Sequence, residues 1–216
     1  MEVLKTFDPF SLNLYNVSTS IIYNDERMKK RIIDFLDKED YIVINSVIFD
    51  SNITVKDFFK ECSFPLKLIP EFNLKRIISR KLNEISHEDF IFIKLLAFIN
   101  LSRLFVVFDD VLTFLSTQNK KTVINFARSK NLIIYNFTSD EEEVLYFPYT
   151  ICLASNKVAI EGPTKKVITE EKILKKLGFD LPFVVDLSLQ LNYYNVTDHV
   201  YFDIDKLVKD LWKKQD

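Results

Sequence analysis

Two adjacent carboxylates, Asp109 and Asp110, directly follow the apolar run Leu104–Phe108. A short run of this composition is typical of a buried strand, so both carboxylates are expected where that strand ends. In nucleotide sites one such carboxylate holds Mg²⁺, directly or through water, and the next can orient the attacking water. Acidic residues also commonly cap the loop after a strand, so the pair by itself leaves both interpretations open.

The sequence around this pair resembles a known family. Residues 85–110 read ISHEDFIFIKLLAFINLSRLFVVFDD, which is similar to the ATP-binding-cassette run from the signature motif through a helix to the Walker B strand. In that register Ser86 falls on the signature serine and Asp109 on the Walker B aspartate, a candidate Mg²⁺ ligand. Asp110 falls on the catalytic glutamate, and Ser139 falls on the switch segment where the family has a histidine.

The C-terminal part carries a more specific resemblance. Residues 169–187, TEEKILKKLGFDLPFVVDL, closely resemble the C-terminal extension of energy-coupling-factor transporter ATPases, the cobalt- and vitamin-type importers. The resemblance is good over about residues 85–191 and poor over the first 84. It implies partners, namely an active ATPase subunit and a transmembrane coupling subunit, and it implies that two cassette subunits pair with help from this extension.

The phosphate-binding loop departs from the family pattern. Lys29 can be placed on the phosphate lysine, but Lys30 then stands on the Mg²⁺-binding hydroxyl and the loop holds no glycine. Average usage would give about 15 glycines, and the chain has 2. Glycine lets successive backbone N–H groups turn toward phosphate at little cost, and Asp25 and Glu26 add negative charge there. Lys29 is therefore also interpretable as an ordinary solvated helix lysine.

The remaining catalytic positions have changed as well. Ser86 is followed by His87-Glu88-Asp89 in place of glycines. This pattern is a good capping box for a helix, but its acids would repel a phosphate at the helix N-terminus. Asp110 is one methylene shorter than glutamate, and Ser139 lacks an imidazole.

Hydrophobic periodicity supplies the elements that would position these residues. Apolar strands alternating with helices predict an α/β layered core with a mainly parallel sheet. By resemblance this is a P-loop-NTPase-like fold with a reduced helical subdomain, a domain at residues 1–164 and a helical extension at 165–216. The expected strands are 41–49, buried on both faces, 104–108, 131–137 and a hairpin of 149–154 with 157–161; the expected helices are 28–38, 54–62, 72–85, 86–101, 119–129, 140–146, 169–177, 182–191 and 203–213.

Composition excludes several function classes. The 216 residues are 48% hydrophobic and have a formal charge of −2, which supports a sizeable core and argues against a dedicated nucleic-acid binder. Two cysteines and two histidines leave little room for a zinc site or a catalytic triad. The apolar stretch 90–108 is interrupted by Lys94 and Arg103, so a buried helix and strand are favoured over a membrane span. A secretory signal is not evident, and we expect a cytoplasmic protein peripheral to the membrane.

These observations lead to one hypothesis and two alternatives. The leading hypothesis is a degenerate cassette subunit of an energy-coupling-factor-like transporter that binds no cofactor and acts as a non-hydrolysing partner or scaffold. The first alternative is a divergent working ATPase, in which Lys29 and Asp109 hold ATP and Mg²⁺ and Asp110 is the base. The second is a soluble interaction protein detached from transport. The glutamine loop of the family would fall at 49–52, where Asp50 replaces glutamine, and homodimer or heterodimer stays open.

Overall fold

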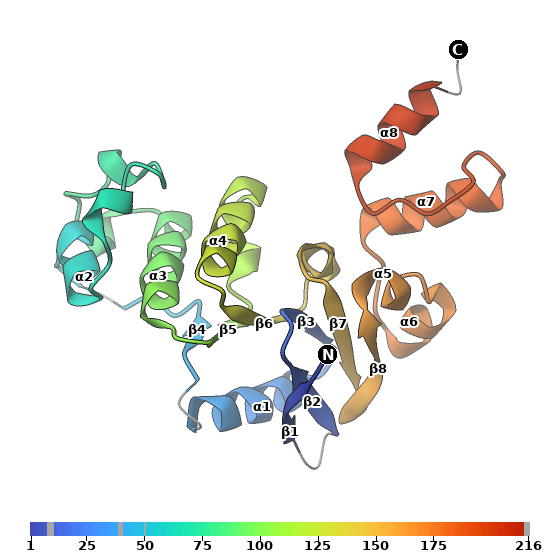
Figure 1. The fold of residues 1–216 in the computed structure, drawn as a ribbon, viewed down its shortest axis with the longest axis horizontal. Coiled ribbons are helices and arrows are strands. Elements are labelled where there is room, and N and C mark those ends of the chain that lie inside the picture. Colours follow the sequence, from blue (N-terminus) through green and yellow to red (C-terminus); the bar gives the residue numbers. More distant parts are fainter. Residues whose placement is uncertain (8–10, 39–40, 50, 214–216) are drawn as a thin grey trace.

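A six-stranded sheet forms the centre of the molecule (Figure 1). The computed structural model describes residues 1–7, 11–38, 41–49 and 51–213. The strands lie in the order β4-β5-β6-β3-β7-β8, and all neighbours are parallel except β7 and β8. Their bounds are β3 Thr19–Tyr23, β4 Val43–Asn45, β5 Phe105–Asp109, β6 Ile133–Thr138, β7 Tyr149–Ala154 and β8 Lys157–Pro163. The predicted α/β class with a mainly parallel sheet is confirmed.

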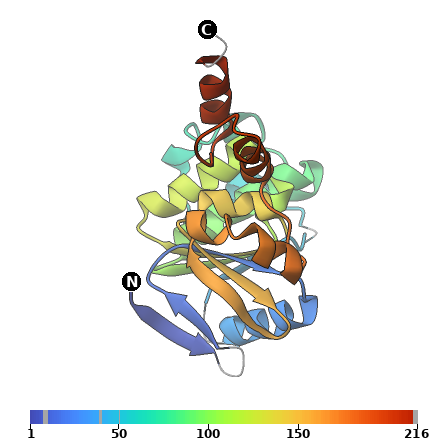
Figure 2. The ribbon, with the colours of Figure 1, turned by 90° about the vertical axis from the view of Figure 1, so that its right-hand side faces the viewer.

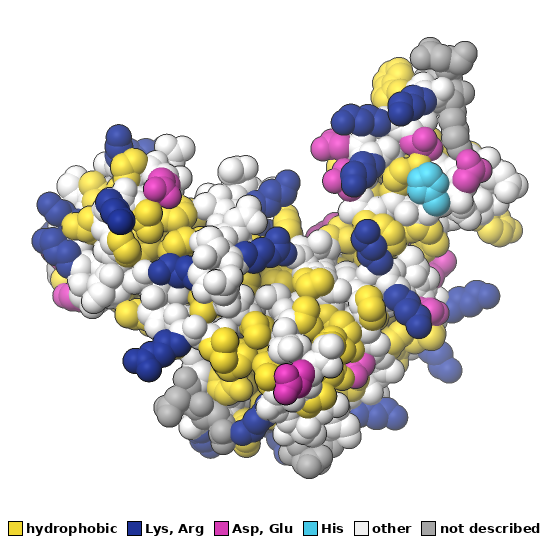
Figure 3. All heavy atoms as spheres, in the orientation of Figure 1, with side chains coloured by type: hydrophobic (Ala, Val, Ile, Leu, Met, Phe, Trp, Pro, Cys, Tyr) yellow, Lys and Arg dark blue, Asp and Glu magenta, His cyan; other side chains and the backbone are white. Residues whose placement is uncertain are grey.

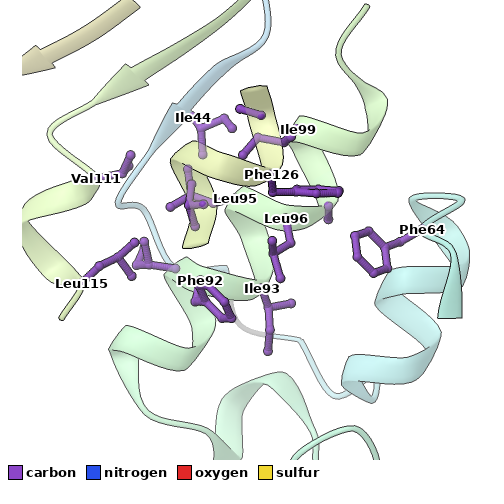
Figure 4. Close-up of a cluster of buried hydrophobic side chains, with 14 of the residues drawn as sticks. Ile44, Phe64, Phe92, Ile93, Leu95, Leu96, Ile99, Val111, Leu115 and Phe126 are labelled. Carbon is purple, nitrogen blue, oxygen red and sulfur yellow. The ribbon is translucent and has the colours of Figure 1, made fainter. Parts of the chain in front are cut away.

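Helices cover both faces of this sheet, as parallel strands require. Helix α1 (Glu26–Lys38) lies on one side with the antiparallel pair β1 (Val3–Phe7) and β2 (Leu12–Tyr15), and helices α2 (Val55–Glu61), α3 (His87–Leu101) and α4 (Thr117–Ser129) lie on the other (Figure 1). Helix α3 is apolar on nearly all sides, which is the pattern of a helix buried within a core. Its residues Phe92, Ile93, Leu95, Leu96 and Ile99 pack together with side chains from α4 and β4 (Figure 4).

Four helices follow β8, namely α5 (Thr164–Val167), α6 (Glu171–Leu177), α7 (Phe183–Tyr193) and α8 (Ile204–Lys213). Gly178 ends α6 in a left-handed conformation with φ of 83°, the usual role of glycine after a helix. Helices α7 and α8 project away from the layered body (Figures 1 and 2). Among the described residues, none of the helices combines the length and apolarity needed to cross a bilayer.

Strand β4 is shorter and less buried than the sequence predicted. The ladder to β5 ends at Asn45, and Val47, Ile48 and Phe49 are exposed rather than buried on both faces. The ammonium of Lys94, itself buried on α3, accounts for this departure, because it donates hydrogen bonds to the carbonyls of Asn45 and Val47 at 2.8 and 3.0 Å. The backbone therefore turns toward α3 instead of continuing along the sheet. Asp50, the changed glutamine position, lies outside the described residues.

The predicted helix at 72–85 is wrong. This stretch forms the three-ten turns η2 (Leu74–Arg76) and η3 (Leu82–Glu84), after an earlier turn η1 (Leu66–Leu68). The carbonyls of Ile78 and Arg80 accept hydrogen bonds from the first residues of α2, at 3.0 and 2.9 Å, so they are not available for an internal helix ladder. The expected helix at 140–146 is also a three-ten turn, η5 (Glu141–Tyr146), and a further turn, η4, covers Leu112–Phe114.

Candidate functional site

Lys29 lies between the two predicted carboxylates at the carboxyl edge of the sheet. Its Nζ is 2.9 Å from Asp109 Oδ1 and 2.9 Å from Asp110 Oδ2. Strand β5 ends at Asp109, and the first turn of α1 brings Lys29 to the same edge, so the topology of the fold brings these residues together. The side chain of Lys29 is 12% exposed. The interpretation of Lys29 as an ordinary solvated lysine is therefore wrong.

Tyr23, the last residue of β3, completes this cluster. Its hydroxyl donates a hydrogen bond to Asp110 Oδ2 and lies 3.2 Å from Glu26 Oε1, while its ring centroid is 5.1 Å from the ammonium of Lys29. The sequence-based prediction missed Tyr23, although a signal was present. The register that puts Lys29 on the phosphate lysine puts Tyr23, six residues earlier, on the first glycine of the G-x-x-x-x-G-K loop.

The surroundings of the cluster favour a neutral Tyr23 hydroxyl and a charged Lys29 ammonium at neutral pH. Burial, followed by the hydrogen bond to Asp110, raises the pKa of the Tyr23 hydroxyl well above its usual value. Burial by itself would lower the pKa of Lys29, but hydrogen bonds to Asp110 and Asp109 outweigh it and raise that pKa. One ammonium thus faces the carboxylates of Asp109, Asp110 and Glu26, the last at 3.1 Å.

The N-terminus of α1 is capped by the protein itself. Two residues, Asn24 and Asp25, connect β3 to α1. Asp25 Oδ1 accepts hydrogen bonds from the backbone N–H groups of Arg27 and Met28, at 2.9 and 3.4 Å. These are N–H groups of the helix end that a phosphate would otherwise use. The chain's own carboxylate occupies them.

Asp110 also contacts the switch position. The backbone N–H of Ser139 donates to Asp110 Oδ1 at 3.0 Å, and the N–H of Asp110 donates to the carbonyl of Phe137. Asp110 adopts a left-handed conformation with φ of 51°, which aspartate tolerates better than most residues. The two oxygens of Asp110 therefore accept from Tyr23, Lys29 and Ser139, and Ser139 takes part through its backbone.

A hollow of about 420 Å³ lies next to this cluster. Its lining includes Glu26, Lys29, Asn45 and Asp109, which belong to α1 and to the ends of β4 and β5. Ligands of parallel α/β sheets bind at this edge. Within residues 1–7, 11–38, 41–49 and 51–213, three or more His, Cys, Asp or Glu side chains do not gather at any point where they could hold a metal ion. The role of Asp109 as an Mg²⁺ ligand stays a prediction.

Ser86 serves as the cap of α3. Its hydroxyl accepts from the N–H of Asp89 at 3.1 Å and donates to the Asp89 carboxylate at 2.8 Å. Glu88 accepts from the N–H of Ser116 and from the side chain of Asn119, and the backbone hydrogen bond to Ser116 is the main cause of its lowered pKa. The role of Ser86 as the N-cap of α3 is confirmed, and the Asp89 carboxylate bonds to the Ser86 hydroxyl instead of the backbone N–H that a full capping box would use. In the described part of the chain, none of the contacts of Ser86 joins it to the Lys29 cluster.

Comparison with known proteins gives sequence relatives of one kind. No family model matches the chain. It is 27% identical over 114 residues to the energy-coupling factor transporter ATP-binding protein EcfA1 of Mycoplasma genitalium, a match covering 51% of this chain and 41% of that protein. It is 24% identical over 114 residues to the corresponding EcfA protein of Malacoplasma penetrans, covering 51% and 40%. The match thus spans about two fifths of the length of these relatives.

Solved structures give the fold. An inward-facing metal-chelate type ABC transporter matches with a TM-score of 0.65 at 15% identity, over 78% of this chain and 81% of that one. CbiO1 from Clostridium perfringens, part of the ABC transporter complex CbiONQ, matches with a TM-score of 0.58 at 11% identity, over 80% and 88%. The chain therefore has the fold of ABC ATPase cassettes, and its resemblance to energy-coupling-factor ATP-binding proteins is confirmed.

Proposed function

We propose that this chain is a cassette subunit of an energy-coupling-factor-type transporter that does not hydrolyse ATP itself and acts as a partner or scaffold for an active ATPase subunit. The relatives named above support the transporter assignment. The observation that carries the non-hydrolysing role is the position of Lys29, whose ammonium is held by Asp109 and Asp110.

A triphosphate does not fit the residues at this site. It would have to take Lys29 from two carboxylates, and its own negative charge would then face Asp109, Asp110 and Glu26. Such like-charge contacts are most costly at Asp109 and Asp110, whose side chains are only 20% and 23% exposed. All three carboxylates already lie at this edge of the sheet, so they would repel a triphosphate without any change in the protein's conformation.

The loop geometry argues in the same direction. The N–H groups of Arg27 and Met28 already bond to Asp25. Tyr23 and Met28 stand where the phosphate loop has glycines, and the phenol of Tyr23 reaches Asp110. A phosphate loop needs free N–H groups and room for close backbone approach. We derive no catalytic step through ATP or Mg²⁺ at this site.

Asp110 is also poorly suited to act as a base. Its oxygens already accept hydrogen bonds from Tyr23, Lys29 and Ser139, so an attacking water would have to compete with these donors for the carboxylate oxygens. Ser139 offers no imidazole to position a water. The preferred interpretation is therefore a subunit that carries no resident cofactor.

The working-ATPase alternative keeps one observation in its favour. Lys29, Asp109, Asp110 and the backbone of Ser139 converge at the carboxyl edge of the sheet, as the ATP-binding hypothesis predicted. Lys29 and Asp109 would then hold ATP and Mg²⁺ after the ion pairs open, with Asp110 as base. This alternative predicts that the purified chain hydrolyses ATP, whereas the proposal predicts that it does not.

The test is the ATPase activity of the purified chain beside the Asp109→Ala, Asp110→Ala double variant. We expect both to release phosphate at the same background rate, because losing even one oriented catalytic group commonly costs about 10²-fold or more. Turnover by the wild type that disappears in the double variant contradicts the proposal and favours the working ATPase.

The proposed partners are an active ATPase subunit and a transmembrane coupling subunit, with the chain at the cytoplasmic side of the membrane. Co-purification of the full chain from native membranes tests this part. Recovery of both partners supports the proposal. Recovery of the chain in the soluble fraction without either of them favours the third hypothesis, a soluble interaction protein.

A further inference from the structure

A second and larger hollow lies at the opposite edge of the sheet from the Lys29 cluster. It has a volume of about 830 Å³. Its walls come from the C-terminal end of α4, from the residues just before β3 and β7 and around the start of β6, and from the end of β8 with α5. Phe202, between α7 and α8, also lines it. Parts of the chain before and after residue 164 therefore meet around this space.

Most of the wall is apolar. Leu132, Ile133, Phe147, Pro148 and Phe202 all contribute to it. Small-molecule sites typically have about 300–1,000 Å³ and a largely apolar lining with a few polar groups. The size and lining of this hollow fall in that range.

The charges of the lining have one sign. Arg128 and Lys165 contribute cations, and none of the described residues that line the hollow is an aspartate or glutamate. The guanidinium of Arg128 is oriented by a hydrogen bond from Nη2 to the carbonyl of Tyr146 at 2.6 Å. The ammonium of Lys165 lies 5.3 Å from the centroid of the Phe202 ring. An anion would be attracted by both cations and repelled by none of the lining side chains.

Two of the neutral polar groups of the lining are already engaged in the fold. Ser18 Oγ accepts from the N–H of Ile134 at 3.0 Å, and Thr164 Oγ1 donates to the carbonyl of Phe147 at 2.7 Å. The lining also includes the neutral polar side chains of Asn16, Asn131 and Tyr146. The preference of the hollow for an anion over an uncharged molecule therefore depends on its two cations.

Next to it lies a further hollow between α4 and helices α7 and α8, which shares Leu145, Tyr146 and Phe202 with the first. Its lining includes Glu142, Asp203 and Asp205. Figure 3 shows the surface notched between α4 and α7–α8, with Lys and Arg side chains on both flanks. The acidic residues of the neighbouring hollow limit the anion-attracting region to the part around Arg128 and Lys165.

We propose that the 830 Å³ hollow binds a small amphipathic anion, an apolar molecule that carries one carboxylate or phosphate group. The apolar body would contact Leu132, Ile133 and Phe147, and the anionic group would face Arg128 and Lys165. Because Phe202 lines the space, the bound molecule would also contact the segment between α7 and α8. Binding of the anion would thus be coupled to the position of α7 and α8.

Calorimetric titration of the full chain with decanoate tests this proposal, with 1-decanol as the uncharged probe of the same length. We expect decanoate to bind the wild type. We expect at least tenfold weaker binding in Lys165→Met and in Arg128→Met, because each loses one cation, while decanol affinity stays unchanged. Lys166→Met is the matched control, because Lys166 is exposed beside Lys165 but does not line the hollow.

Two further arms define the occupant. Phe202→Ala should weaken both decanoate and decanol, since it removes part of the apolar wall. Decyl phosphate tests whether phosphate replaces carboxylate, and vesicles of phosphatidylglycerol test a bilayer as the source of the anion. Equal decanoate affinity in the Lys165→Met and Lys166→Met variants overturns the proposal, and so does binding to the vesicles without binding to either soluble anion.

Discussion

Lys29 links the start of α1 to the distant end of β5. Asp109 is the last residue of β5, Asp110 follows it, and Tyr23, which ends β3 just before α1, joins the same cluster. A lysine that binds a ligand must be free to leave its contacts within the protein. Here the ammonium of Lys29 is instead held by carboxylate oxygens of Asp109 and Asp110 at 2.9 Å. The cluster therefore stabilises the fold at the carboxyl edge of the sheet, and its contribution to stability can be measured.

Replacing Lys29 with methionine should destabilise the fold by about 2–3 kcal/mol. Removing one partner of a buried ion pair costs about 3–5 kcal/mol, and the carboxylates here are partly exposed, at 20% and 23%. Urea denaturation measures the change. Lys30→Met is the matched control, because Lys30 is exposed and surface changes usually stay within about 0.5 kcal/mol. Equal stability of the two variants contradicts the structural role of Lys29.

The same variant has a predicted pH dependence. The pKa of Lys29 is raised in the folded protein above its ordinary value of 10.5. A raised pKa contributes stability that is fully present below the unfolded value and is lost as pH rises through the folded value. The difference in free energy of unfolding between wild type and Lys29→Met should therefore be constant from neutral pH to about pH 9 and should narrow above 10.5.

Nucleotide should not stabilise this chain. A ligand that binds the native state raises its stability by mass action, and in a domain of this size 1 kcal/mol shifts the melting temperature by about 2–4 °C. With Asp25, Glu26 and Tyr23 occupying the phosphate region, we expect a shift below about 1 °C at millimolar Mg-ATP. Thermal melting of the purified chain measures it, and a shift of several degrees is incompatible with the proposed function.

The sequence predicts part of this site and misses the rest for a physical reason. Motif register identifies Lys29, Asp109 and Asp110, and the lack of glycine indicates that the phosphate loop is not intact. The sequence does not show that Tyr23 and Lys29 point at the same carboxylate, because that contact depends on how β3, β5 and α1 pack. Spacing along the chain carries no information on such distances.

At the scale of elements, one buried ion pair joins α4 to η5. Lys120 Nζ lies 2.9 Å from Glu143 Oε1, and Glu143 is fully buried. Asn136 of β6 donates to the other oxygen of Glu143 at 3.1 Å. The pKa of Glu143 is raised, chiefly by burial, although Lys120 opposes that rise.

Lys120→Met should cost about 3 kcal/mol at pH 7, because it leaves a buried carboxylate without its cation. It also removes the contact that opposes the raised pKa of Glu143. The cost should shrink as pH falls toward 4.5, the ordinary value of the Glu143 pKa, because a carboxyl with a raised pKa takes up its proton in the folded form of both proteins before that pH is reached. Denaturation at several pH values measures this, with Lys121→Met, which is exposed, as the control. A cost that does not change with pH contradicts the assignment to Glu143.

The sequence predicted well those elements that have a strong local pattern, such as an apolar run or a helix cap. It did not predict the elements whose conformation is fixed by backbone hydrogen bonds to distant parts of the chain. The buried run at 131–137 became β6 and the Ser86 cap began α3, as expected. The stretch 72–85 has helical periodicity but is tied through Ile78 and Arg80 to the start of α2. Tertiary hydrogen bonds replaced the local preference there.

At the scale of the whole molecule, the predicted boundary at residue 164 does not separate two hydrophobic cores. One cluster contains Ile22 of β3 and Cys152 of β7 together with Val167, Leu174 and Val185 from beyond that boundary. Removing residues 165–216 would uncover this face of the sheet. Val184 and Val185 of α7 and Leu207 of α8 also belong to this cluster, so the role of the C-terminal helices is better tested by substituting exposed residues than by a deletion.

The C-terminal helices keep apolar side chains on their surface, which is the feature that a pairing role requires. Phe183 is 65% exposed and Trp212 is 67% exposed, whereas Val185 on α7 is buried. The buried side chains serve the chain's own core, and the exposed ones do not. Exposed aromatic residues of this kind are enriched where proteins associate.

If α7 and α8 pair with a cassette ATPase subunit, the Phe183→Ser, Trp212→Ser double variant should lose that subunit in co-purification from native membranes. Because both side chains are exposed, the melting temperature should change little. Leu104→Ser is the matched control, because Leu104 is 52% exposed but lies at the start of β5, outside the C-terminal helices. If the double variant is folded and still co-purifies with the ATPase subunit, pairing uses another surface. If the Leu104→Ser control also loses the ATPase subunit, the effect is not specific to these helices.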